Sequence, residues 1–173
     1  MRSVARRGGA GLVMALVGML AAGSLAAQAP TDVKRVDPNP RGRILSGVAV
    51  PANRAVYHTS GTTPPMVDST AARGTRERFG DTYTQGVNTL RRIEENLKGQ
   101  GLSMKDVIFL RVYLVADKLK GNAFDFDGWN KAYGEFFNTP QNPVKVARST
   151  VGVAWLADPD LLIEIEAVAV YPN

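Results

Sequence analysis

The spacing of apolar residues predicts a long amphipathic helix near the middle of the chain. From residue 82 to residue 98 the apolar positions recur at steps of three and four, at Val87, Leu90, Ile93 and Leu97. This period places them on one face of a helix, and charged residues occupy the rest of its surface. Asp81 or Thr82 can cap the first amide groups, and Gly99 and Gly101 are placed to end the helix.

A second amphipathic helix is predicted over residues 122–137. Its apolar face is formed by aromatic side chains, namely Phe126, Trp129, Tyr133, Phe136 and Phe137. We expect this stripe to pack into the core, because aromatic residues at helical spacing bury large apolar areas.

Five segments have the composition of strands. Two short ones, residues 44–50 and 55–58, are expected to form a hairpin that leads to Ser60-Gly61. Residues 107–115 are apolar at nearly every position, which is typical of a central strand covered on both faces. The last two strands are predicted at residues 144–153 and 161–170.

The predicted order, β-β-α-β-α-β-β, indicates an α+β fold with both helices on one face of the sheet. Two helices cannot cover both faces of so apolar a sheet, so we expect the other face to be buried in an oligomer. The last strand shows both kinds of face. Glu164 and Glu166 lie on one, and the other is wholly apolar, with Leu161, Ile163, Ile165, Ala167 and Ala169.

Two stretches show neither the helical nor the strand period of apolar residues. Residues 28–43 contain several prolines and are expected to form a flexible segment before the folded domain, which we place at residues 44–173. Residues 62–80 contain Pro64-Pro65 and a charged run, and a loop of this length is usually functional or mobile. We favour a solvated loop over an arm that binds a partner.

Composition excludes several kinds of site. The chain of 173 residues is 45% hydrophobic and 21% charged, which is typical of one globular domain. It has no cysteine, so disulfides, a cysteine nucleophile and thiolate metal sites are excluded. His58 is the only histidine, which excludes a multi-histidine zinc site, and we expect no metal. No phosphate loop or dinucleotide fingerprint is present.

Residues 1–27 have the order of a secretory signal peptide. Arg2, Arg6 and Arg7 precede an uncharged run, and cleavage is expected after Ala26 or Ala27, so the protein is expected to be secreted or periplasmic. A retained membrane anchor is the alternative, although the run barely reaches the ~20 apolar residues that a span needs. Without the leader, 18 basic residues face 16 acidic ones, which argues against a nucleic-acid partner.

Arg148 is the most unusual charged residue, because it lies in an apolar strand. Its guanidinium offers two parallel donors that match a carboxylate, which suits it to hold an acidic substrate. The alternative is a structural ion pair with Glu164 or Glu166, which we expect on an adjacent strand. A carboxylate near an arginine can stay ionised and orient or deprotonate a water molecule.

Ser60-Gly61 follows an apolar strand and can offer a hydroxyl and an amide to an anion, although such a dipeptide also marks an ordinary turn. His58 is interpreted as structural, because no acid and nucleophile are spaced around it in a catalytic pattern.

Several blocks together resemble the RidA (YjgF) family of reactive-intermediate deaminases. They are Ser60-Gly61, the helix of residues 85–97, Gly101 with Asp106-Val107, residues 129–137 (WNKAYGEFF), residues 147–151 (ARSTV) and residues 163–169 (IEIEAVA). The resemblance extends from about residue 43 to residue 170. The last two blocks, at their observed separation, are its most specific part.

The resemblance implies a chorismate-mutase-like homotrimer whose sheets pack into a central barrel, with three clefts between subunits. It also implies hydrolysis of enamines and imines, such as 2-aminoacrylate, to 2-keto acids and ammonia. Arg148 would then hold the substrate carboxylate and Glu164 would position the attacking water. Ser60, Gly61 and Asn130 would line the pocket. No cofactor is expected, because an imine carbon is already electrophilic.

Three departures from the family pattern bear on substrate preference. Leu45 stands where many members have a pocket tyrosine, Thr62 stands where they have glutamine, and Thr150, in the expected pocket, replaces a cysteine. The alternative function is a non-catalytic trimer that binds small carboxylates or shields unfolded proteins in the envelope. Cleavage of RNA, an activity of some relatives, fits poorly with the small excess of basic residues.

Overall fold

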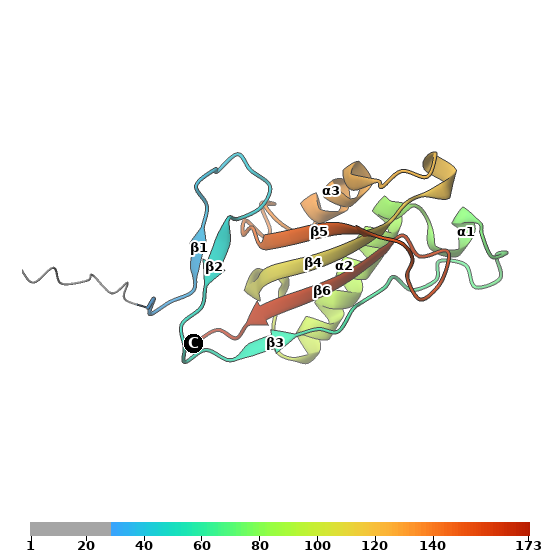
Figure 1. Cartoon of the computed structure of the whole chain (residues 1–173). Coiled ribbons are helices and arrows are strands. Elements are labelled where there is room, and N and C mark those ends of the chain that lie inside the picture. The colour runs from blue at the N-terminus through green and yellow to red at the C-terminus, as the bar shows by residue number, and fades with distance from the viewer. Residues whose placement is uncertain (1–28) are drawn as a thin grey trace, which may run out of the picture.

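A four-stranded mixed sheet forms the centre of the computed structural model, which describes residues 29–173 (Figure 1). The strands lie in the order β3 (Val56–His58), β6 (Ile163–Val170), β4 (Val107–Val115) and β5 (Ala147–Val153). β6 pairs antiparallel with both of its neighbours, and β4 pairs parallel with β5. The predicted signal peptide, residues 1–27, lies outside the described residues.

Two short strands form a separate pair beside this sheet. β1 (Lys34–Val36) pairs antiparallel with β2 (Gly47–Ala49). The expected hairpin between residues 44–50 and 55–58 is therefore wrong. The physical reason is that β6 offers an apolar strand edge far along the sequence, and β3 pairs with that edge instead of with its near neighbour.

The segment expected to be flexible is tied to the domain around β1. The guanidinium of Arg35 donates hydrogen bonds to the carbonyls of Lys145, Lys105 and Val107, at 2.9 to 3.0 Å. In return, Nζ of the buried Lys145 donates to Asp37 at 2.8 Å. These contacts link β1 to the first residue of β4 and to residues that precede β4 and β5.

The two predicted helices are present. α2 (Thr82–Gly99) begins as expected, with the Asp81 side chain accepting a hydrogen bond from the Thr84 amide at 2.9 Å. α3 (Phe126–Gly134) is shorter than predicted, because Asp125 caps it by accepting from the Gly128 amide. Phe126 is 44% exposed, so its expected place in the buried stripe is wrong.

Both helices cover the same face of the sheet (Figure 1). Gly86 of α2 allows a close approach to α3, because a Cβ atom there would lie 2.9 Å from that of Ala132. The core between helices and sheet is almost fully closed to solvent. It contains Leu90, Ile93 and Leu97 from α2, Trp129 and Tyr133 from α3, and Leu110, Val112, Leu114, Ile163, Ile165, Ala167 and Ala169 from the sheet.

The other face of the sheet carries no helix within the described chain. We call it the open face; it presents Phe109, Arg111, Tyr113, Val151, Glu164, Glu166 and Val168. Within the described chain β4 is therefore covered on one face, and the cover that its sequence predicts on the other face is expected from an oligomer. Glu166 is held on this face by Arg111 at 2.9 Å and by the Tyr113 hydroxyl at 3.0 Å.

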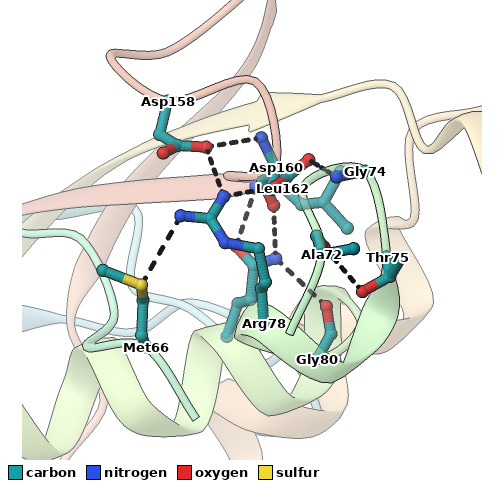
Figure 2. A network of polar contacts seen from close by, with 10 residues as sticks. Met66, Ala72, Gly74, Thr75, Arg78, Gly80, Asp158, Asp160 and Leu162 are labelled. Atoms are coloured by element: carbon teal, nitrogen blue, oxygen red, sulfur yellow. Dashed lines mark hydrogen bonds and ion pairs between the residues drawn. The ribbon is translucent and has the colours of Figure 1, made fainter. Parts of the chain in front are cut away.

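The long segment after β3 is fixed in its second half, where a fully solvated loop was expected. It contains the short helix α1 (Arg76–Phe79), and Arg78 is only 6% exposed. Figure 2 shows the Arg78 guanidinium paired with Asp160 and, at 3.4 Å, with Asp158, while its other terminal nitrogen faces the Met66 sulfur. Two short 3₁₀ turns, Met104–Asp106 and Lys118–Lys120, flank β4.

Gln85 ties α2 to this segment and to β6. Its buried amide donates to the carbonyls of Gly80 and Asp160 and accepts from the Leu162 amide at 2.8 Å. Gln85→Leu leaves these backbone groups unpaired, so we expect the free energy of unfolding to fall by about 2–4 kcal/mol. Urea denaturation measures the loss, with the exposed Gln100→Leu as control. Equal unfolding midpoints for the two variants would contradict this role.

Candidate active site

Arg148 extends from β5 toward α3 rather than toward the open face. In the sheet it lies opposite Leu110, which lies opposite Ala167, and both of these side chains face the helices. Its Nη2 donates a hydrogen bond to Oδ1 of Asn130 at 2.8 Å. The guanidinium carbon lies 4.7 Å from the centre of the Tyr133 ring, in a cation–π contact.

The charge of Arg148 has no counter-charge among residues 29–173. Its Nη1 is buried and makes no hydrogen bond, and the structural ion pair considered with Glu164 or Glu166 is not formed. Burial lowers the pKa of Arg148. The Tyr133 hydroxyl opposes this shift, and the positive charge of Arg43 adds to it. A buried donor in such a setting can bind an anion strongly, because an unpaired charged group in a low-dielectric site is unfavourable.

Thr150 lies two residues farther along the same face of β5. Its Oγ1 accepts a hydrogen bond from the indole nitrogen of Trp129 at 3.3 Å, and the same Trp129 ring lies 5.3 Å from the Arg148 guanidinium carbon. The structure therefore brings together three of the predicted residues. We call Asn130, Arg148 and Thr150 the arginine half-site.

A second group forms where the chain leaves β3. Thr59 and Thr62 both pair with β6, each donating its amide to a β6 carbonyl at 2.9 Å, and Ser60-Gly61 bulges out between them. A Cβ atom on Gly61 would overlap Oε1 of Glu164, so only glycine leaves this carboxylate in place. We call Ser60, Gly61 and Glu164 the glutamate half-site.

The two half-sites lie on opposite faces of the sheet. Glu164 is opposite Tyr113 on the open face, whereas Arg148 lies level with Leu110 on the helix face. The expectation that Arg148 and Glu164 lie on adjacent strands is also wrong, because β4 runs between β5 and β6. One chain therefore cannot bring these two side chains onto one small molecule.

The remaining sequence candidates have other positions. Glu166 is paired with Arg111, as one of the two glutamates was expected to satisfy arginine donors. Leu45 is buried and donates its amide to the Val146 carbonyl, so it flanks the strand that carries Arg148. The sequence predicts only core packing for Trp129 and Tyr133, and it does not indicate a role for Arg43 near the site. The two aromatic residues, four apart, flank Asn130 at helical spacing, which is the signal that could have placed them at the site.

Two hollows of the described chain contain no residue of either half-site in their linings. One, of about 340 Å³, lies among residues that include Arg76, Asp117 and Leu119, and the other, of about 350 Å³, lies between Glu94 and Asn142. Among residues 29–173, no cluster of histidine and carboxylate side chains is arranged to hold a metal. In the same range, no helix combines the length and hydropathy of a membrane span.

Comparisons with known proteins agree with this architecture. The family model described as Endoribonuclease L-PSP matches residues 36–171. The chain is similar to YyfB from Yersinia pestis, a protein of unknown function in the conserved Rid family, with 26% identity over 81% of this chain and 99% of that one and a TM-score of 0.60. It is also similar to E. coli TdcF, whose structure contains bound serine, with 28% identity over 80% and 100% of the two chains and a TM-score of 0.53.

Proposed function

Because this chain belongs to the Endoribonuclease L-PSP family, which includes the YjgF and Rid proteins, we propose that it hydrolyses reactive imines and enamines of amino acids to 2-keto acids and ammonia. One observation carries the proposal. Nη1 of Arg148 is buried and unpartnered beside Asn130, which supports a role in binding the substrate carboxylate.

The proposed site is assembled between subunits of a homotrimer. The arginine half-site of one subunit would meet the glutamate half-site of the next, since a single chain separates them by its own sheet. The open face supports this arrangement, because it presents Phe109, Tyr113, Val151 and Val168 without cover in the described chain.

Hydrolysis in this cleft needs only positioning and proton transfer. Arg148 and Asn130 hold the carboxylate, which fixes the neighbouring C=N carbon. Glu164 of the partner subunit accepts a proton from a water molecule as the water oxygen attacks that carbon, and it passes this proton to the nitrogen. Glu164 then takes the hydroxyl proton of the tetrahedral intermediate and delivers it to the amino group, so that the C–N bond breaks, ammonia leaves and the hydroxyl becomes the keto oxygen. An enamine enters after protonation of its β-carbon.

The direct test uses imines made in situ by an amino-acid oxidase. The purified protein is expected to accelerate release of keto acid and ammonia above the uncatalysed rate, without added metal or cofactor. Calorimetry with 2-ketobutyrate reports binding separately. Binding without acceleration would favour the alternative, a non-catalytic trimer that holds small carboxylates.

Assembly through the open face has its own test. Val151 is 45% exposed in the single chain and lies opposite Tyr113, so Val151→Asp would bury an unpaired charge in the proposed interface. We expect this variant to sediment as a monomer and to lose the activity, whereas Lys98→Asp, on the exposed end of α2, stays trimeric. A trimeric Val151→Asp would show that the open face is not the interface.

A further inference from the structure

Two aromatic residues, one just before α3 and one at its first position, point to the substrate class. We propose that Phe124 and Phe126 form an apolar wall for the substrate side chain, so that the preferred substrates are imines of amino acids with large apolar or aromatic side chains. This inference rests on the proposed function. Arg148 and Asn130 would bind the substrate carboxylate, and the wall would select the substrate's side chain.

The position of Phe126 relative to the clamp carries the first step. Phe126 and Asn130 are four residues apart on α3, so their side chains lie on one helix face, about 6 Å apart at Cβ. Asn130 contacts Arg148 directly. A substrate whose carboxylate binds there therefore has Phe126 one helical turn away, which matches the span from the carboxylate to the ring of a phenylalanine-derived imine.

Phe124 extends this wall over β5. Its ring centre lies 6.2 Å from that of Phe126, with the two planes tilted by 52°. A Cβ atom on Gly152 would lie 2.6 Å from the Phe124 ring, so the ring rests directly on the strand where Gly152 has no side chain. Gly152 shares its strand face with Arg148 and Thr150, since the three alternate along β5.

The wall faces solvent in the described chain. Phe124 is 43% exposed and Phe126 is 44% exposed, although their neighbours Trp129 and Tyr133 are fully buried. These two aromatic rings lie one helical turn from Asn130, the hydrogen-bond partner of the Arg148 guanidinium. The proposed surface therefore has an anion site at one end and an apolar surface at the other. A keto acid or imino acid with a bulky side chain has the same two ends.

The test compares the imines of phenylalanine, leucine and alanine, each made in situ by an amino-acid oxidase. We expect wild-type kcat/KM to be higher for phenylalanine and leucine than for alanine. Phe126→Ala is expected to lower the phenylalanine-to-alanine ratio by about tenfold, the size of one lost aromatic contact. Gly152→Ala, which displaces the Phe124 ring without removing it, is expected to lower the same ratio. Leu119→Ala, an exposed apolar control, leaves it unchanged.

Product binding gives a second readout that does not depend on turnover. Phenylpyruvate is expected to bind more tightly than pyruvate, Phe126→Ala is expected to remove the difference, and Arg148→Ala is expected to weaken both. Suppose that all three imines are hydrolysed faster, but that Phe126→Ala and Gly152→Ala leave the phenylalanine-to-alanine ratio of kcat/KM unchanged. This result would overturn the inference and leave the proposed hydrolysis standing. No acceleration of any imine would refute the proposed function itself. A changed sedimentation of Phe126→Ala would assign the wall to a subunit contact and also overturn the inference.

Discussion

Replacing Arg148 by alanine is expected to lower kcat/KM for imine hydrolysis by about a hundredfold or more, which corresponds to about 2.7 kcal/mol of transition-state binding. The loss follows from the geometry of the clamp. Asn130 already occupies Nη2, so the buried and unpartnered Nη1 is a donor that a carboxylate can take. The rate of keto-acid release from imines made in situ measures the effect.

The same substitution separates a binding role from a structural one. Burial disfavours the charged form of Arg148, as the direction of its pKa shift shows, so the folded state gains little from this cation. We therefore expect Arg148→Met, which keeps the packing against Tyr133, to unfold at the same temperature as wild type or higher while it loses activity. Arg91→Ala, an exposed arginine on α2, is the matched control and keeps full activity. Equal rates for wild type and Arg148→Ala would end the proposal.

Mixing two inactive variants is expected to restore activity. Arg148→Ala keeps an intact glutamate half-site, and Glu164→Gln keeps an intact arginine half-site. If each cleft takes one half-site from each of two neighbouring subunits, random assembly of equal amounts makes roughly one cleft in four complete, so about a quarter of the wild-type activity returns. The variants are unfolded together, refolded and assayed, with separately refolded mixtures as the control.

This experiment has a clear contrary result. If both residues acted within one subunit, every mixed trimer would contain only damaged sites, and co-refolding would restore nothing. The register of the sheet argues for restoration, since Glu164 lies with Tyr113 on the open face and Arg148 lies with Leu110 on the helix face.

Local pattern was a sound guide to elements that depend on their own residues. The spacing of Val87, Leu90, Ile93 and Leu97 predicts α2 almost to its ends, because one helix face packs on the sheet and Asp81 supplies the cap. The run of residues 107–115, apolar at every position except Arg111, predicts β4 with its full length. Both faces of β6 follow from the alternation around Glu164 and Glu166.

Strand pairing between distant segments could not be predicted from the local sequence. Nothing in residues 44–58 indicates that β2 pairs with β1 and β3 with β6, since short strands carry little information about their partners. The sequence likewise gives no sign that Arg35 donates hydrogen bonds to three distant carbonyls. For the same reason, the residue types of the candidate site were predictable, but its division between two faces required the register of the strands.

The placement of the two half-sites on opposite faces of the sheet affects the activity of the protein before it assembles. A newly folded chain carries Arg148 and Glu164 on different faces of its sheet. If each cleft takes one half-site from each of two subunits, as we propose, that chain would be inactive until it meets another copy. Dilution would then dissociate the subunits by mass action and lower the activity per subunit. Total activity would rise more steeply than protein concentration. At concentrations too low for subunits to associate, the chain would then remain inactive.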